Sequence, residues 1–290
     1  MPAPMSPAAQ AQIRVDMQFM FSNHKGVHKP RLEKRQRKLL EKVSFIGRFL
    51  EPDERVLLVT PCVSPTSLFE QLTTGVIFAY INRALLVVTN KGLFHVPTSA
   101  NFKYRFSIAK IRYVDCKEVR IRRGYLLVQY GDGKKERYLY LPRAQRLKLK
   151  GLFEQMKLGA GTKVGKLHLC PRCTGALSDG VYQCPKCRLP FKNWTTAMKL
   201  SILLPGGGYF YTGHPFLGIG DFFVETMLLL FVVAEVVGIF QGDPESPAAA
   251  VLFGVALVLE KLLTIHHAKR YIGEFIPEYK KVQAQPTSGG

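Results

Sequence analysis

Four of the six cysteines fall in one short stretch, CPRCTGALSDGVYQCPKC, at residues 170–187. The stretch contains two Cys-x-x-Cys pairs, each with a proline after its first cysteine. A Cys-x-x-Cys turn can direct two thiolates at one ion, and two such turns that face each other form a tetrahedral sulfur site. Zinc prefers this ligand set and this geometry. We therefore expect a zinc site with the ligands Cys170, Cys173, Cys184 and Cys187.

A site with four protein ligands has no open coordination position, so its zinc would be structural. The alternative is a redox-active dithiol pair. Free thiolates indicate a reducing compartment, which places the stretch in the cytosol. The adjacent Arg172, Lys186 and Arg188 would offset the charge of the thiolates or contact nucleic acid. Cys62 and Cys116 are isolated in apolar surroundings and are expected to be ordinary core thiols.

The cysteine stretch resembles the short zinc ribbons found in many bacterial membrane and regulatory proteins. We assign the ribbon to residues 167–193 and a flexible linker to residues 159–166. A module of this size cannot fold on hydrophobic burial alone, so the metal would supply the missing stability.

The elements before the ribbon form a strongly basic half. Residues 1–29 are expected to be a disordered arm. A basic amphipathic helix is expected from Pro30 to just before Pro52. Such a helix can lie on an anionic membrane surface, but we favour packing of its apolar stripe on the next domain.

Short strands follow, and then a helix begins after Pro142. The pattern predicts strands at residues 55–60, 84–89, 92–96, 110–114, 119–121, 125–130 and 136–141. Turn signals at residues 90–91 and 131–134 join two strand pairs. Antiparallel strands covered by one C-terminal helix would form a small bent sheet or barrel.

The run RALLVVTNKGLFHVP, together with the hairpin and the closing helix, resembles the pleckstrin-homology superfold in its GRAM-like or bacterial form. We assign this domain, with the basic helix, to residues 30–158. The resemblance implies a binding module for lipid headgroups or proteins rather than an enzyme. Residues 72–88 are mostly apolar, but they contain Asn82 and Arg83 and are interpreted as a core strand or short helix that enters the hairpin.

The whole chain is basic, with 41 Lys and Arg against 21 Asp and Glu and a formal net charge of +20. This excess favours an anionic partner, although a solubilising excess with the positive-inside bias explains it equally well. Six residues are expected to cluster on or near two strands and their turn, where they would bind an anionic lipid or, less well supported, nucleic acid. They are Arg120, Arg122, Arg123, Lys134, Lys135 and Arg137.

Two long apolar segments, at residues 216–240 and 247–266, follow the ribbon. Each is long enough to cross the hydrocarbon layer as a helix. Basic residues flank the pair on both outer sides, so we expect both termini in the cytoplasm and residues 241–246 outside. We assign the membrane domain to residues 196–270 and a cytoplasmic tail to residues 271–290. The expected location is the inner membrane. The expected partners there are further copies of the chain, in a homo-oligomer, or another membrane protein.

The motif SILLPGGGYFYTG at residues 201–213 resembles the signature of small two-span bacterial membrane domains, which a zinc ribbon often precedes. The signature positions are Pro205, Gly206, Gly208, Tyr211 and Gly213. Glycine there permits tight turns and close backbone approach, and the aromatic residues suit the membrane interface.

Four acidic residues, Asp221, Glu225, Glu235 and Glu260, lie inside the apolar segments, where ionisable groups are costly. They could line an ion path in an oligomer. We favour Asp221 and Glu260 near the cytoplasmic interface, with Glu225 and Glu235 paired or protonated in a helix bundle.

The sequence contains no catalytic signature of the common hydrolase, metalloprotease or nucleotide-loop type. The expected fold is a multidomain α+β membrane protein, with a PH-like antiparallel β domain, a zinc ribbon and a transmembrane helical hairpin. The leading hypothesis is a non-enzymatic, membrane-anchored binding or scaffold protein. The alternatives are a membrane-tethered nucleic-acid binder and an oligomeric transporter or channel component.

Overall fold

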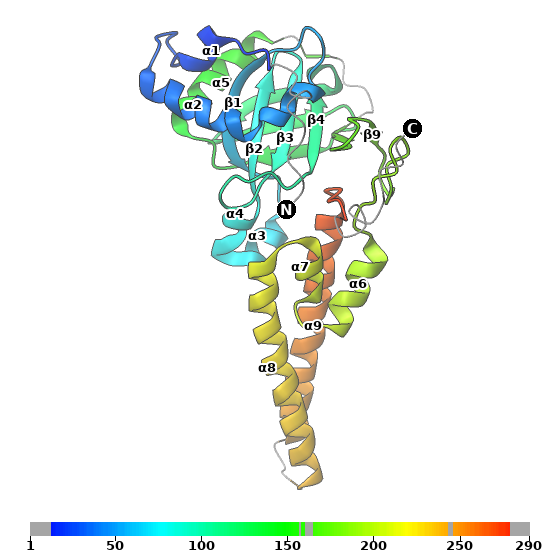
Figure 1. Cartoon of the computed structure of the whole chain (residues 1–290). Helices are drawn as coiled ribbons and strands as arrows, with labels where there is room; N and C mark the ends of the chain where they lie inside the picture. The colour runs from blue at the N-terminus through cyan, green and yellow to red at the C-terminus, as the bar shows by residue number, and fades with distance from the viewer. Residues whose placement is uncertain (1–12, 157, 160–164, 243–245, 279–290) are drawn as a thin grey trace. The chain divides into compact units, whose positions relative to one another are not determined.

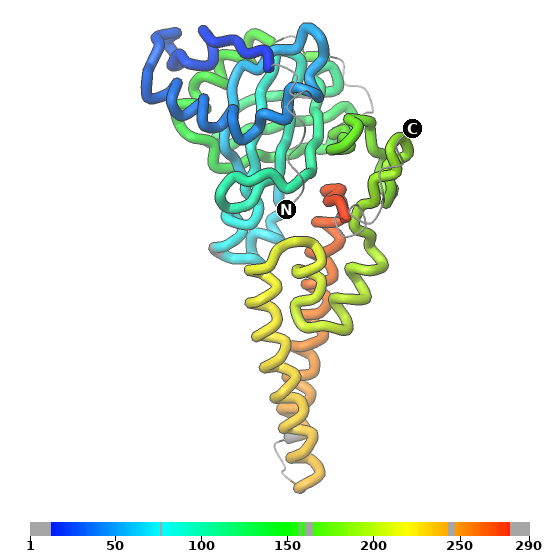
Figure 2. The backbone as a smooth tube through the Cα atoms, viewed as in Figure 1, coloured from blue at the N-terminus to red at the C-terminus, as the bar shows by residue number. Residues whose placement is uncertain are grey.

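The computed structural model describes residues 13–156, 158–159, 165–242 and 246–278 (Figures 1 and 2). The chain divides into two compact units. The first unit comprises Met1–Ser178 and Pro185–Cys187, and the second comprises Asp179–Cys184 and Arg188–Gly290.

The first unit is built mainly from antiparallel strands. They are β1 (Val56–Val63), β2 (Arg83–Thr89), β3 (Gly92–Pro97), β4 (Ile108–Arg112), β5 (Cys116–Arg122), β6 (Tyr125–Tyr130), β7 (Lys135–Tyr138), β8 (Leu167–Leu169) and β9 (Ala176–Leu177). One sheet has the order β1-β2-β3-β4-β8-β9 and the other the order β5-β6-β7. Val63 and Leu139 exchange backbone hydrogen bonds of 2.9 and 3.1 Å, which links the first sheet to the segment after β7.

The helices of this unit are α1 (Met17–Phe21), α2 (Pro30–Lys42), α3 (Leu68–Thr74), α4 (Phe78–Ile81) and α5 (Arg143–Gln155). The larger sheet is buried on both faces because β1–β4 alternate between two cores. Leu86 and Val88 belong to a core shared with the smaller sheet and α5. Leu85 and Val87 belong to a second core that α1 and α2 cover. Figure 1 shows α2 lying along the larger sheet.

The N-terminal region differs from its expectation. Residues 1–12 lie outside the described residues, but residues 13–29 of the expected disordered arm are ordered. Val15 bridges Val56, and Met20 and Phe21 are buried in the second core. The basic helix also ends at Lys42, earlier than expected, and a 3₁₀ segment, η2 (Ser44–Phe49), follows it. Its apolar side chains pack on the sheet, as the favoured interpretation of this helix expects.

The strand positions agree with the sequence expectation to within a few residues, and α5 begins directly after Pro142. The apolar stretch at 72–88 is split. Its first part belongs to α3, a 3₁₀ turn η3 (Gly75–Ile77) and α4, and its second part is the central strand β2. β2 pairs with both β1 and β3 in the interior of the sheet. Its sequence is continuously apolar because both faces of the strand are buried, one in each core.

The second unit is mainly helical. Its helices are α6 (Trp194–Leu203), α7 (Gly207–Thr212), α8 (Pro215–Phe240) and α9 (Ser246–Ile272). α8 and α9 pack side by side as a long hairpin, drawn in yellow and orange in Figure 2. Both helices are long and apolar enough to cross a membrane, and their most apolar windows are almost entirely exposed. Of the expected outer loop, residues 243–245 lie outside the described residues.

Part of the expected tail is folded. Phe275 and Ile276 are buried, and Phe191 forms a bridge with Pro277. The backbone N–H of Lys192 donates to the carbonyl of Ile276 at 3.0 Å. The segment after α9 therefore packs on the segment that precedes α6. Residues 279–290 lie outside the described residues.

Candidate functional site

The two Cys-x-x-Cys turns have the same backbone geometry. In the first turn, the N–H of Thr174 donates to the carbonyl of Cys170 at 3.0 Å, and the N–H of Cys170 donates to the carbonyl of Gly175 at 2.8 Å. In the second turn, Arg188 and Cys184 form the equivalent bond at 2.9 Å. Thr174 and Arg188, each directly after a second cysteine, both have positive φ, 59° and 55°. Both turns therefore bend the chain so that the paired thiols lie together.

The four sulfur atoms of Cys170, Cys173, Cys184 and Cys187 lie within 4.8 Å of one another. The sulfur atoms of Cys170 and Cys187 are 3.5 Å apart. Four soft donors gathered on two matching turns fit a tetrahedral ion such as zinc. The donor set expected from the sequence is therefore brought together, and it can hold a metal ion.

The first cysteine turn is attached to the sheet of its own unit. β8 pairs with β4, with Ile108 opposite Leu169, so the strand just before Cys170 extends the larger sheet. Arg48 of η2 donates from Nη2 to the carbonyl of Pro171 at 2.6 Å. Neither contact could be predicted from the sequence, because β8 is only three residues long and Arg48 lies 123 residues before Pro171 in the chain. The segment assigned as an independent ribbon thus begins as a strand of the larger sheet, between β4 and β9.

The remaining two cysteines are core residues, as expected. Cys62 and Cys116 are 3% and 0% exposed and pack in the core between the two sheets. Burial raises the pKa of each thiol to about 12, so both remain protonated at neutral pH. Neither thiol is activated for chemistry.

The six basic residues singled out from the sequence are all exposed on the smaller sheet and its turns, but they do not form one compact cluster. Arg120, Leu127 and Arg137 lie in one row across β5, β6 and β7. Paired residues point to the same face, and neighbouring strands are about 4.8 Å apart, so Arg120 and Arg137 lie on the same face about 10 Å apart, on either side of Leu127. Arg120 forms an ion pair with Glu118 on the same strand.

The other basic residues lie at the two ends of β6. Arg122 and Arg123 are at the β5–β6 turn, where Arg122 pairs with Tyr125. Lys134 and Lys135 are at the β6–β7 turn, about 20 Å further along the strand. The basic surface is therefore an extended strip along one sheet face. The sequence alone could not predict the strip, because it does not show that the β5–β6 and β6–β7 turns lie at opposite ends of β6.

Glu136 lies on the opposite, buried face of β7 and is 8% exposed. It accepts hydrogen bonds from the hydroxyls of Tyr130 and Tyr138 at 2.7 and 2.8 Å. Burial alone would raise its pKa, but the nearby Lys166 and the two hydroxyls hold that pKa below the ordinary value of a glutamate. Because this carboxylate faces inward, it leaves the outer face of the strand basic.

The glycine-rich motif packs the backbones of three helices closely together. Gly206 has a φ of 67°, and a Cβ there would lie 2.2 Å from the carbonyl oxygen of Gly218. A Cβ on Gly208 would lie 2.1 Å from the hydroxyl of Ser201. The hydroxyl of Tyr211 accepts a hydrogen bond from the backbone N–H of Asn193 at 3.1 Å. Gly213 ends α7 with a φ of 84°. The motif residues therefore shape the junction of α6, α7 and α8.

Three of the four acidic residues in the apolar helices come together. Carboxylate oxygens of Asp221 and Glu225 on α8 and of Glu260 on α9 lie within 4.8 Å of one another. Glu225 is 1% exposed, and Lys261 donates to it at 2.5 Å. The hydroxyl of Thr264 donates to Asp221 and Glu260, both at 3.0 Å.

The cluster also gives Glu225 a partner on the other helix. Glu225 pairs with Lys261, in line with the expectation of a paired or protonated residue, whereas Glu235 lies ten residues further along α8 and outside the cluster. The physical reason is that α9 runs antiparallel to α8, so residues near the end of one helix face residues near the start of the other. Glu260 and Lys261 are adjacent in the sequence. Only the pairing of α8 with α9 shows that these two residues face Asp221 and Glu225.

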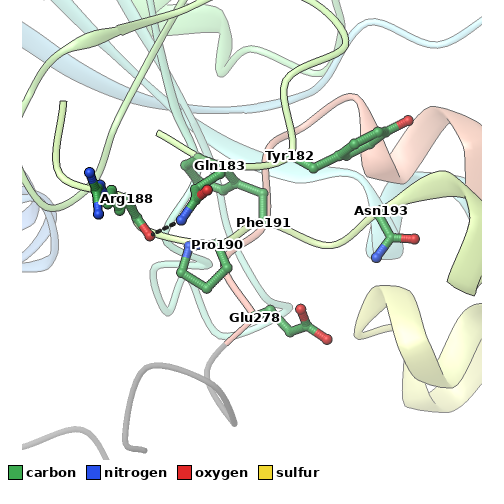
Figure 3. A pocket seen from close by; sticks show the side chains of 7 residues that line it. All are labelled: Tyr182, Gln183, Arg188, Pro190, Phe191, Asn193 and Glu278. Atoms are coloured by element: carbon green, nitrogen blue, oxygen red, sulfur yellow. Dashed lines mark hydrogen bonds between the residues drawn. The ribbon is translucent and has the colours of Figure 1, made fainter. Parts of the chain in front are cut away.

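A cavity of about 480 Å³ lies beside the second cysteine turn (Figure 3). The Nε2 of Gln183 donates to the carbonyl of Arg188 at 3.1 Å across its wall. The residues that line it are Tyr182, Gln183, Arg188, Pro190, Phe191, Asn193 and Glu278. This cavity could not be predicted from the sequence, because Glu278, in the segment after α9, is distant in the chain from the other lining residues.

Comparison of the chain with models of protein families, with characterised proteins and with solved structures found no match. The case for any function therefore rests on the residues and contacts described above.

Proposed function

We propose that this chain is a non-enzymatic, membrane-anchored binding protein. In this proposal α8 and α9 cross the inner membrane of a bacterium, and both chain termini lie in the cytoplasm. The first unit is a PH-like domain that binds anionic lipid headgroups, and the cysteine segment is a structural zinc ribbon. Four observations support it: the two long exposed apolar helices, the two-sheet unit closed by α5, the matched cysteine turns and the basic strip.

The observation that carries the binding role is the outer face of the smaller sheet. Arg120 and Arg137 lie in one row there, on either side of Leu127. Arg122 lies at the adjacent turn, and the acidic Glu136 is turned inside. Each Lys or Arg close to an anionic membrane surface contributes about 1 kcal/mol. Three such residues on one face would therefore favour contact with an anionic surface by about 3 kcal/mol.

The test is hydrogen exchange of the full chain in nanodiscs, with and without phosphatidylserine. We expect phosphatidylserine to slow exchange in the β5–β6 turn, and added salt to reverse this protection because the contact is electrostatic. The triple variant Arg120→Gln/Arg122→Gln/Arg137→Gln should lose the protection.

The matched control is Arg31→Gln/Lys34→Gln/Lys38→Gln, which removes the same charge from exposed positions on α2. It should keep the protection of the turn. Equal loss in both triple variants, or no response to phosphatidylserine at low salt, would reject a specific role of the basic strip.

Under this proposal the zinc ribbon has a structural role and is not a catalytic site. All four ligands come from the chain, so a bound zinc would have no position open to a substrate. Cys170 directly follows β8 of the larger sheet, and α6 begins at Trp194, shortly after the second cysteine turn. The ribbon would fix the path of the chain between the binding domain and the membrane helices.

A second candidate function, transport of protons or cations by an oligomer, is favoured by one observation. Asp221, Glu225 and Glu260 outnumber the single ammonium of Lys261 in the described cluster. Proteoliposomes that carry a pH-sensitive dye would test it. A leak that disappears in Asp221→Asn would support transport, and impermeable vesicles would exclude it.

A further inference from the structure

The connection between β1 and β2, residues 65–82, is the most apolar exposed part of the first unit; we call it the apolar loop. It contains α3, η3 and α4. We propose that the apolar loop inserts into the interfacial region of a lipid bilayer and gives the first unit its own membrane contact. This inference rests on the membrane anchoring in the proposed function, but not on the basic strip or its lipid selectivity.

The apolar loop exposes large hydrophobic side chains along both of its helices. The exposed fractions are 72% for Leu68, 52% for Phe69, 73% for Leu72, 44% for Ile77 and 45% for Tyr80. Scattered single hydrophobic residues are normal on a protein surface, but five within thirteen residues concentrate exposed apolar area in one short segment. Such a surface indicates contact with another apolar phase.

The charge of the apolar loop fits a lipid environment. Glu70 is the only charged residue between positions 65 and 82, and it is 4% exposed. Its carboxylate accepts a hydrogen bond from the N–H of Ser67 at 2.8 Å, and the hydroxyl of Ser67 accepts one from the N–H of Glu70 at 3.1 Å. This capping box uses the only charged side chain internally, so the outer surface of the loop carries no charge.

Three further polar side chains of the apolar loop form hydrogen bonds within it. The hydroxyl of Thr73 donates to the carbonyl of Phe69 at 2.9 Å, and that of Thr74 donates to the carbonyl of Glu70 at 2.5 Å. The side chain of Asn82 donates to the carbonyl of Phe78 at 3.0 Å. Internal bonding lowers the cost of leaving water, because a polar group without a partner is expensive in hydrocarbon.

The border of the apolar loop has the residues typical of a membrane interface. The guanidinium of Arg83, the first residue after the loop, lies 4.9 Å from the ring centroid of Tyr80. Tyr140, which is 64% exposed, lies beside Phe78 with ring centroids 6.0 Å apart. Tyrosine and arginine at the edge of an apolar surface suit the depth of the headgroups.

A bilayer is the occupant that the chain itself supplies. The same polypeptide carries α8 and α9, which are long and apolar enough to cross a membrane, so the first unit is tethered within reach of lipid. Attachment to the anchor greatly raises the effective concentration of the loop at the bilayer. Even a weak interfacial helix would then insert.

The test uses tryptophan as a depth probe in the full chain. The sequence has one tryptophan, Trp194, so the background variant is Trp194→Phe. Leu72→Trp places the probe in the apolar loop, and Ile77→Trp provides a second position. The matched control is Leu147→Trp, at an exposed leucine on α5 of the same unit that is 47% exposed. All variants are placed in uncharged phosphatidylcholine nanodiscs, with ordinary or brominated acyl chains.

We expect brominated lipid to reduce the emission of the Leu72→Trp and Ile77→Trp variants about twofold and to leave the Leu147→Trp variant nearly unchanged. Emission at short wavelength without quenching would mean that protein, such as a second copy of the chain, covers the loop. That result, or long-wavelength unquenched emission at both loop positions, would overturn the proposal. Because the lipid is uncharged, the outcome is independent of the test of the basic strip.

Discussion

Among the residues that the structure describes, two clusters bring ligand-type atoms within 4.8 Å of one another, one of four cysteines and one of three carboxylates. The cysteine cluster is assembled from two turns of the same local geometry, which lie within 18 residues. The carboxylate cluster is assembled by the packing of α8 on α9 and joins residues 39 positions apart. The first depends on local backbone geometry and the second on tertiary packing.

This difference predicts how each cluster responds to change. The thiolates repel one another unless an ion binds them, so the cysteine cluster should depend on its metal. The carboxylate cluster already holds an internal cation, because Lys261 lies 2.5 Å from Glu225. Its stability should therefore depend on this ion pair.

The largest effect is expected from the loss of one cysteine ligand. Binding of zinc to a site of four protein ligands contributes about 10 kcal/mol to the folding of a small module. Cys184→Ala should therefore abolish metal retention and greatly accelerate hydrogen exchange in residues 167–193. The metal content per chain and the exchange rate are the measurements. Cys116→Ala, at a buried cysteine outside the cluster, should retain the metal. Full metal retention by Cys184→Ala would show that the cysteines are not the ligands.

The next effect concerns the ion pair in the second unit. Lys261→Met leaves the carboxylate of Glu225, which is 1% exposed, without its cation. Removing one partner of a buried pair costs about 3 kcal/mol. Unfolding in bicelles with added dodecyl sulfate measures this loss of stability.

The second substitution of a double-mutant cycle checks the interpretation. Lys261→Met/Glu225→Gln should regain much of the lost stability, because no buried charge is left without a partner. Glu235→Gln, outside the cluster, should change the free energy of unfolding by less than about 1 kcal/mol. An additive double variant would contradict the pairing.

A smaller effect tests the close packing around the carboxylate cluster. A methyl group on Gly208 would meet the hydroxyl of Ser201 at 2.1 Å and the Cγ2 of Thr264 at 3.2 Å. Gly208→Ala should therefore cost about 2 kcal/mol, by the same bicelle measurement. Gly220→Ala is the matched control, since a Cβ there meets nothing within 4 Å. It should be neutral or slightly stabilising, because alanine favours helix.

The smallest effect comes from a partly exposed ion pair. Hydrogen bonds from Lys91 and Lys110 lower the pKa of Glu51 to about 2. A depressed carboxyl pKa stabilises the fold above the unfolded pKa near 4.5, and this stability is lost as the pH falls from 4.5 towards 2. Solvent screening limits the contribution to about 0.5 kcal/mol. Glu51→Gln should flatten the acid slope of the unfolding free energy by this amount.

The comparison also explains what the sequence could predict. The cysteine ligands were predictable because a Cys-x-x-Cys turn fixes its own geometry. Strands β2 and β3 were predictable because Asn90 and Lys91 form a turn between two apolar runs. The apolar helices α8 and α9 were predictable from length and composition alone.

Features that depend on pairing of distant segments were not predictable. Alternation along β5 and β7 indicated basic residues, but only the register places Arg120 and Arg137 in one row across the sheet. The ordered start of the chain was missed because Met20 and Phe21 are buried by α2 and β1, not by neighbours in the sequence. The pairing of Glu225 with Lys261 was missed for the same reason.

X-ray absorption spectroscopy of the full chain, isolated from membranes without added metal, tests the four-cysteine metal centre most directly. We expect about one zinc ion per chain, with four sulfur ligands at about 2.3 Å and no oxygen or nitrogen ligand. Intact mass would then show all six cysteines in the reduced form. An oxygen or nitrogen ligand would contradict a closed structural site, and a metal-free chain with disulfides among residues 170–187 would contradict the metal centre itself.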